Sequence, residues 1–274
     1  MRPTAVSRAP SGHGSAEVGS TRLALAGQEW AEAELARPDL TRAELARAEL
    51  ARVELARVDL ARVDLARAEL ARVDLARAEL ARVDLAEVEF AVIDLETTGW
   101  SPQAAAITEI AAVRVRGGRR LGEFASLINP GVPVPRGIED LTGISDWMLA
   151  AAPKLAAVLP GLLAFADGCV LVAHNAPFDV GFLIAACAEC DLAWPGFTVL
   201  DTVMLARRVM DPDEVPDCKL GTLAGFFRAR TAPSHRALAD ARATADVLGW
   251  LIRRLAHRGV RTLSQLSAWP EVVA

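Results

Sequence analysis

Two hydrophobic patterns divide the chain. Leucine recurs every fifth residue from Leu35 to Leu85, Phe90 takes the next position, and a carboxylate precedes each of these residues. From about residue 89 the pattern changes to short apolar runs and amphipathic stretches. The chain therefore predicts a disordered N-terminus over 1–30, a pentad-repeat segment over 31–88, a folded domain over 89–258 and a C-terminal tail over 259–274.

The usual repeat unit is (A/V)-(D/E)-L-A-R. In an α-helix five residues turn the chain by about 500°, so successive leucines spiral round the rod and form no apolar stripe. A solvated single helix stays open, because each acid meets an arginine three residues later. The unit also resembles the pentapeptide-repeat family, which implies a β-solenoid of about three coils over 31–90. We favour the solenoid for structure. For function we favour a low-complexity expansion with no role of its own.

The remainder of the chain alternates strand and helix patterns. Apolar runs predict strands near 89–96, 107–115, 121–128, 169–174 and 197–201. Amphipathic stretches predict helices near 139–149, 154–166, 178–190, 202–209, 219–228 and 236–257. The strands begin as a meander and then alternate with helices, which indicates an α/β fold with a mixed sheet and helices on both faces.

Composition narrows the function classes. The chain has 274 residues and a formal net charge of −5, which argues against polybasic binding of nucleic acid. A nuclease remains open, because bound metal ions can supply positive charge. No apolar run reaches the ~18 residues of a membrane span, and residues 1–20 contain no signal-peptide core. With four cysteines, the expectation is a cytoplasmic protein without a membrane partner.

Acidic residues stand at the ends of two apolar strands. Asp94 and Glu96 alternate along the first strand and therefore point to one face. Two acids there need a cationic partner, and oxygen-only ligands favour Mg²⁺ or Mn²⁺. Asp179 follows the strand that ends at His174. Taken alone, Asp179 is explained equally well as a functional acid and as an acid that complements the dipole at the start of a helix.

A third acidic motif begins the last helix, where His235 precedes Asp240 in His-Arg-Ala-Leu-Ala-Asp. The segments VIDLETTG, HNAPFD and HRALADA, in this order, resemble the three motifs of the DEDDh (DnaQ-like) 3′–5′ exonucleases. ITEIAA and LTGI are similar to the secondary signatures of that family. Within the family the chain most resembles the exonuclease half of bacterial proteins that fuse this domain to a GIY-YIG nuclease.

The resemblance implies an RNase H-like fold and a catalytic set. Asp94, Glu96, Asp179 and Asp240 would hold two divalent cations, and His235 would be the general base. Phosphodiester hydrolysis fits, because two metals activate water and relieve charge on the phosphate. Candidate substrate-binding residues lie within the first two motifs or directly after the first: Thr97, Thr98, Gly99, Trp100, His174, Asn175 and Phe178. Of these, Trp100 and Phe178 suit stacking on a base or sugar, although packing explains Trp100 equally well, and a structural role suits His174.

The function indicated by the resemblance is removal of nucleoside 5′-monophosphates from the 3′ end of DNA, in proofreading or repair, as by the epsilon subunit of DNA polymerase III. A 3′–5′ exoribonuclease on short RNA is the alternative, because only 2′-OH contacts separate the two. A repeat-based binding protein with an incidental nuclease domain is the second alternative. The expected partners are a single-stranded 3′ end and, as a candidate, a DNA polymerase. We also expect a protein truncated to begin at Ala86 to fold and act like the full chain.

Overall fold

The computed structural model describes residues 41–211 and 213–268, apart from the side chains of residues 73, 76, 77 and 268. The chain divides into two compact units, residues 1–76 and 77–274. The disordered segment expected over 1–30 lies outside the described residues. None of the helices in the described ranges is long and apolar enough to cross a membrane.

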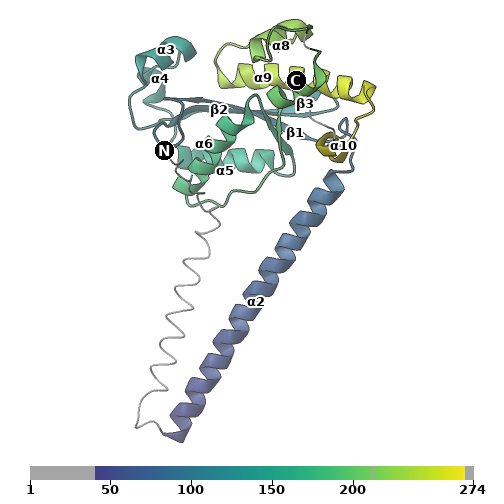
Figure 1. The fold of residues 1–274 in the computed structure, drawn as a ribbon. Helices are drawn as coiled ribbons and strands as arrows, with labels where there is room; N and C mark the ends of the chain where they lie inside the picture. Colours follow the sequence, from purple (N-terminus) through teal and green to yellow (C-terminus); the bar gives the residue numbers. More distant parts are fainter. Residues whose placement is uncertain (1–40, 212, 269–274) are drawn as a thin grey trace, which may run out of the picture. The chain divides into compact units, whose positions relative to one another are not determined.

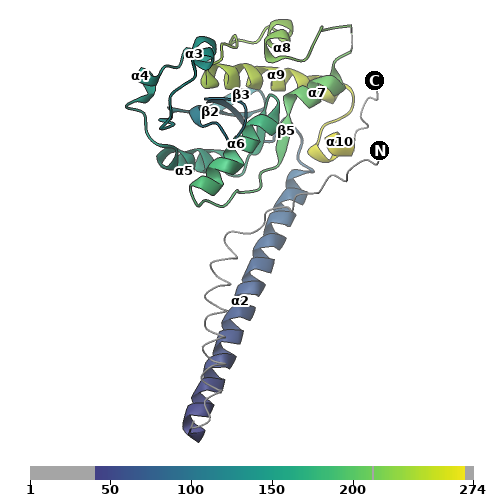
Figure 2. The same cartoon turned by 60° about the vertical axis from the view of Figure 1, so that its left-hand side comes forward.

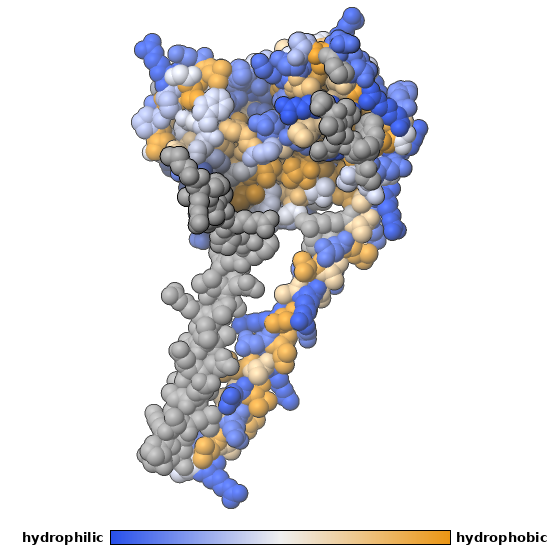
Figure 3. Space-filling model, in the orientation of Figure 1, coloured by the Kyte–Doolittle hydropathy of each residue, from blue (hydrophilic) through white to orange (hydrophobic). Residues whose placement is uncertain are grey.

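The repeat forms one continuous helix, α2 (Arg42–Leu80). Our preference for the solenoid was therefore wrong over these residues, because helix-forming residues and local acid–arginine pairs support a single helix. Thr41 and Glu44 begin it with a capping box, in which the Thr41 amide donates to Glu44 Oε2 at 2.8 Å. Acid–arginine pairs three residues apart line the exposed helix, as at Asp64 and Arg67. Apolar and polar side chains are interleaved along the helix and form no separate face (Figure 3).

A five-stranded mixed sheet forms the centre of the second unit (Figure 1). Its strand order is β3-β2-β1-β4-β5. The strands are β1 (Phe90–Thr97), β2 (Ile107–Arg116), β3 (Arg119–Leu127), β4 (Val170–Ala173) and β5 (Val199–Asp201). The first three strands are antiparallel, whereas β4 runs parallel to β1 and β5 runs parallel to β4. The expected mixed sheet is confirmed.

Helices cover both faces of this sheet (Figure 2). The helices on one face are α7 (Thr202–Val209), α8 (Leu220–Phe227) and α9 (Ala237–His257). The helices on the other face are α5 (Leu155–Ala166) and α6 (Ala176–Glu189). Alternation along β1 serves both layers: Phe90 and Val92 pack toward α9, whereas Ala91 and Ile93 pack toward α5 and α6. Asp94 and Glu96 continue the α9-facing row, so the strand period sets the face on which the acids lie.

The helix expected at 139–149 is instead two short helices, α3 (Arg136–Thr142) and α4 (Asp146–Leu149). Gly143 separates them with a left-handed backbone, φ 68°, which ends α3 with a bond from its amide to the Glu139 carbonyl. The single-helix prediction was wrong because this glycine stands inside its range.

The domain core includes residues on both sides of 89–258. Leu85 and Val88 are buried beside Leu263 and Leu266. The latter two belong to α10 (Leu263–Ala268), a helix in the segment that we expected to be a tail. The Leu85 amide donates to the Arg261 carbonyl at 2.6 Å, which ties the start of the domain to its end. The end of the repeat is therefore part of the fold.

Candidate active site

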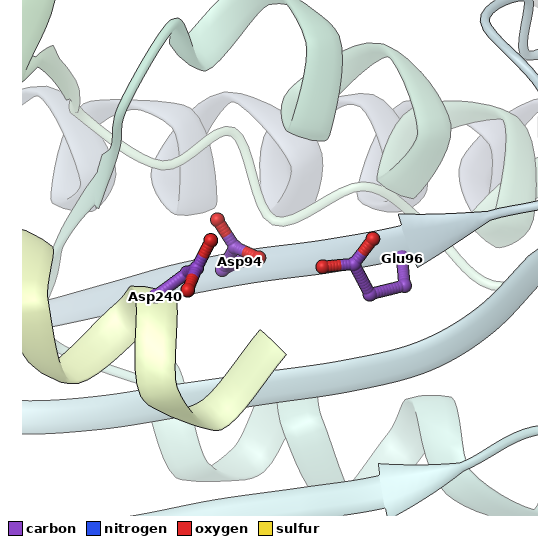
Figure 4. A group of neighbouring side chains, drawn as sticks. All are labelled: Asp94, Glu96 and Asp240. Atoms are coloured by element: carbon purple, nitrogen blue, oxygen red, sulfur yellow. The ribbon is translucent and has the colours of Figure 1, made fainter. Parts of the chain in front are cut away.

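Three carboxylates from two elements meet at one point. Asp94 and Glu96 lie on β1, and Asp240 lies in the first turn of α9. One carboxylate oxygen from each lies within 4.8 Å of the other two. Figure 4 shows the carboxyl groups of Asp94 and Asp240 pointing toward each other, with Glu96 farther along the same strand. This cluster brings together residues that are 144 positions apart (96 and 240) in the sequence.

Asp179 reaches the same place from α6. Strand β4 pairs with β1 only from Phe90 to Val92, so the second half of β1 has no β4 partner. The Leu95 amide donates instead to Asp179 Oδ1 at 3.1 Å. Asp179 is buried, and it lines the same cavity as the three clustered acids. The side chain thus closes a gap in the sheet and places a fourth carboxylate beside Asp94.

His235 lines the same cavity from the loop that precedes α9. Its backbone has a left-handed conformation, φ 54°, which is unusual for a residue with a side chain. The amide of Ser234 donates to Asp240 Oδ1 at 2.7 Å. This hydrogen bond holds the loop that carries the His235 imidazole close to the Asp240 carboxylate. The structure therefore brings all five expected catalytic residues to one cavity of about 280 Å³.

The carboxylates of this cavity hold their protons more tightly than ordinary acids. Burial, followed by the charges of the neighbouring carboxylates, raises the pKa of Asp94 well above its usual value. Burial and the charges of Asp240 and Glu109 raise the pKa of Glu96 to about 7. Burial also raises the pKa of Asp179 to about 8 and raises the pKa of Asp240. Charged together, these groups repel one another, and a cation between them removes that cost.

The donor set fits divalent metal ions. The clustered ligands are carboxylate oxygens only, from Asp94, Glu96 and Asp240, with Asp179 adjacent. Hard cations such as Mg²⁺ and Mn²⁺ prefer such ligands. The repulsion within the cluster supplies a second, independent reason to expect positive charge there.

Most of the expected substrate-binding residues line this cavity, but Thr98 is turned toward its own loop. The lining residues among them are Thr97, Gly99, Trp100, His174, Asn175 and Phe178. The Thr98 hydroxyl accepts from the Ala106 amide at 2.9 Å, so its observed role is to shape the loop after β1. Its contact with substrate stays a prediction.

The aromatic rim and the second motif have distinct surroundings. The Trp100 side chain is 76% exposed, and its ring centroid lies 6.2 Å from that of Phe178. His174 Nδ1 lies 2.9 Å from the Thr202 hydroxyl, and burial lowers the pKa of the imidazole. Asn175 adopts φ 71° at the start of α6, and its amide donates to Asp201 Oδ1. Trp100 is therefore the exposed aromatic side chain of this rim, and the half-buried Phe178 lies beside it.

Glu109 and Arg236 are site residues to which the sequence assigned no role. Glu109 lies opposite Glu96 on β2, and its buried carboxylate forms two bonds with Arg236, at 2.9 and 3.1 Å. The amide of Ala237, the first residue of α9, also donates to Glu109 at 2.9 Å. Glu109 thus caps the helix that carries Asp240, from the strand next to β1. The only sequence signal was its place in the ITEIAA signature.

Helix α3 supplies a further wall of the cavity. Ile138, Leu141 and Thr142 line it together with the acids of β1. The LTGI signature marked this segment in the sequence but indicated no contact with the site. The cavity therefore has an acidic floor and a partly apolar wall, a combination suited to a phosphate with a base or sugar attached.

Comparison with known proteins agrees with this geometry. The sequence profile of the Exonuclease family (RNase_T) matches residues 91–248, and that of the pentapeptide repeats matches residues 54–91 in eight copies. A protein of Mycobacterium tuberculosis, whose name describes a bifunctional exonuclease/endonuclease, is 50% identical over 181 residues, which are 64% of this chain and 28% of that protein. A PolC-type DNA polymerase III of Caldanaerobacter subterraneus is 39% identical over 174 residues, 64% of this chain and 12% of that protein.

The fold is also that of a solved nuclease. The zinc-bound complex of Escherichia coli Exonuclease I with single-stranded DNA matches 62% of this chain and 42% of its own, with 19% identity and a TM-score of 0.55. The chain spans less than a third of the length of the two relatives named above. Since the family profile covers more than half of the chain and includes every clustered carboxylate, the protein belongs to the Exonuclease (RNase_T, DnaQ-like) family.

Proposed function

We propose that this domain removes nucleotides one at a time from the 3′ end of single-stranded DNA, with Mg²⁺ or Mn²⁺, and releases nucleoside 5′-monophosphates. The observation that carries the proposal is the meeting of Asp94, Glu96 and Asp240 within 4.8 Å, with Asp179 and His235 at the same cavity. The four carboxylates are the groups that would hold the cations.

Each residue has a distinct task in this scheme. Bound divalent cations would lower the pKa of water and neutralise charge on the reacting phosphate. The imidazole of His235 accepts the proton of the attacking water, which requires its neutral form. Trp100 and Phe178 at the rim stack on the terminal base or sugar and align the last phosphodiester bond with the acids.

The proteins in which similar domains occur favour DNA over RNA as the substrate. The PolC-type relative is named as a DNA polymerase, and the solved nuclease is described with single-stranded DNA. Both facts concern those proteins, and they support DNA as the substrate class here. They also support a role beside a DNA polymerase, in proofreading or repair.

The experiment is digestion of 5′-labelled strands of the same sequence as DNA and as RNA, with Mg²⁺, with Mn²⁺ and with chelator. We expect the labelled DNA to shorten in steps of one nucleotide with either metal, and to stay intact with chelator. Immediate release of the labelled end would refute the direction. Faster shortening of RNA would refute the substrate class.

A pair of matched variants separates the site from the rest of the chain. Asp94→Asn removes a clustered carboxylate, and it should abolish nearly all shortening. Asp64→Asn changes an acid of the same type on the exposed repeat helix and should leave the rate unchanged. Activity of Asp94→Asn near that of Asp64→Asn would remove Asp94 from the reaction.

A further inference from the structure

A second cavity, of about 280 Å³, lies along the middle of α9, away from the acids. Its charged lining consists of four arginines and one aspartate: Arg120, Arg228, Arg230, Arg253 and Asp246. This concentration of positive charge stands out in a chain whose formal net charge is −5. Gly249 opens the cavity, because a Cβ at that position would meet no atom within 4 Å. The cavity therefore has room for an anion among fixed guanidinium groups.

Three of the arginines are held in place. Arg230 and Arg120 both bond to the carboxylate of Asp246, which is 6% exposed, with nitrogen–oxygen distances of 2.7 and 3.4 Å. The guanidinium of Arg253 lies 4.1 Å from the ring centroid of Trp250. Such groups lose little conformational entropy when they bind a ligand. The Arg120 Nε, moreover, is buried without a hydrogen-bond partner among the described residues.

The fourth arginine occupies a position that glycine usually takes. Arg228 ends α8 with a left-handed backbone, φ 54°, and within the described ranges it forms no ion pair. A residue with a side chain costs free energy there, and strained positions of this kind cluster where a side chain has a use. Arg253 likewise has no carboxylate partner among the described residues. Arg228 and Arg253 are thus the two cationic groups free to meet a ligand.

We propose that this arginine cavity binds the phosphate backbone of the strand whose 3′ end lies in the active site; the inference rests on the proposed nuclease function. Guanidinium forks match phosphate oxygens in geometry and charge. Thirteen residues of α9 separate Asp240 from Arg253, about 20 Å at 1.5 Å per residue. At about 3.4 Å per nucleotide, a strand of roughly six nucleotides spans that distance. The cavity can therefore bind long strands, whereas the shortest strands do not reach it.

Recognition here is of the backbone, not of base identity. The Trp250 ring already stacks on Phe227, with an interplanar angle of 5°, and is covered by Arg253. Base stacking on the ring is thus disfavoured, and binding should be independent of sequence. A neighbouring cavity, whose lining includes the apolar side chains of Leu85, Phe90 and Ile252, shares Gly249 and Arg253 with the arginine cavity. It makes an acidic peptide with apolar side chains the competing occupant.

The test compares strands of 3 and about 20 nucleotides with the double variant Arg228→Ala/Arg253→Ala. For the long strand with Mg²⁺ we expect KM to rise about 5- to 20-fold with kcat unchanged, because two phosphate contacts are lost. The slope of log affinity against log salt should fall by about 1.4, or 0.7 per contact. Hydrolysis of the 3-nucleotide strand should not change. The matched control is Arg52→Ala/Arg57→Ala, which removes the same charge from the exposed repeat helix.

The outcomes are distinct. An unchanged KM for the long strand, or an equal effect of the control variant, overturns the proposal. The proposal is also overturned if the wild type binds an acidic peptide, the double variant does not, and KM for DNA is the same in both. That result would assign the cavity to a protein partner. Binding of the long strand is also measured in chelator, without hydrolysis. If the nuclease proposal fails, neither strand is hydrolysed. If only the arginine-cavity proposal fails, both strands are hydrolysed, and the double variant and its control have the same KM for the long strand.

Discussion

Replacing Glu96 with glutamine should stabilise the metal-free protein at pH 8. The folded state raises the pKa of this carboxyl from 4.5 to about 7, chiefly through burial and then through the charges of Asp240 and Glu109. The folded protein therefore binds more protons than the unfolded chain between these two values, so stability falls as the pH rises through that window. At about 1.4 kcal/mol per pH unit, the penalty at pH 8 is roughly 3 kcal/mol.

The assay is thermal unfolding in chelator at pH 5, 6, 7 and 8. For a unit of this size, 1 kcal/mol corresponds to about 2–4 °C, so Glu96→Gln should raise Tm at pH 8 by roughly 5–12 °C. At pH 5 the variant and the wild type should differ little. Added Mg²⁺ should raise Tm of the wild type more than that of the variant, because the cation removes the same repulsion.

Glu123→Gln is the matched control. The hydrogen bond from Arg242, on the same helix as Asp240, lowers the pKa of Glu123. Its loss should therefore lower Tm near neutral pH, the opposite sign for the same chemical change. Destabilisation by Glu96→Gln at pH 8 in chelator, or a wild-type Tm that rises steadily from pH 5 to 8, would refute the electrostatic account of the site.

Three further outcomes follow from the structure. His235→Ala should slow hydrolysis by about 10²–10⁴-fold and leave metal affinity, measured by calorimetry, nearly unchanged. Loss of metal binding together with turnover would show that His235 is a metal ligand instead. Glu109→Gln should lower kcat by about 10- to 100-fold while leaving KM for a short strand nearly unchanged, because it loosens the start of α9; an unchanged kcat would limit Glu109 to stability. The burial of Leu85 replaces our expectation that a protein starting at Ala86 behaves like the full chain: truncation before Ala86 should lower the free energy of unfolding by about 2–5 kcal/mol relative to truncation before Arg77, as measured by chemical denaturation; equal midpoints would place Leu85 outside the working fold.

Local patterns predicted the site better than they predicted its support. The two-residue period of β1 places Asp94 and Glu96 on one face, so a single strand carries that information. The bond between Glu109 and Arg236 joins residues 127 positions apart, and no local pattern encodes such a pair. The sequence therefore indicated which side chains meet in the cavity, but not which residues hold them there.

Element boundaries failed for physical reasons that differ from place to place. Gly143 divides the helix expected over 139–149, because a left-handed backbone ends α3 there. The short helix α10 has few apolar positions of its own and depends on burial beside Leu85. The repeat sequence is compatible with two structures. It matches the pentapeptide-repeat pattern of a solenoid, but its helix propensity and local acid–arginine pairs also stabilise a helix.

The repeat helix can change length without redesign. In α2 the stabilising interactions are local, as in the pairs Asp59–Arg62 and Asp64–Arg67, and many of its leucines are exposed. Adding or deleting one pentad preserves every remaining pair. Each such step would lengthen or shorten the rod by about 7.5 Å and rotate whatever precedes it by about 140° about the helix axis. Variants that differ only in the number of pentads would therefore form a graded series of spacers, with reach and orientation set together by a single repeat count.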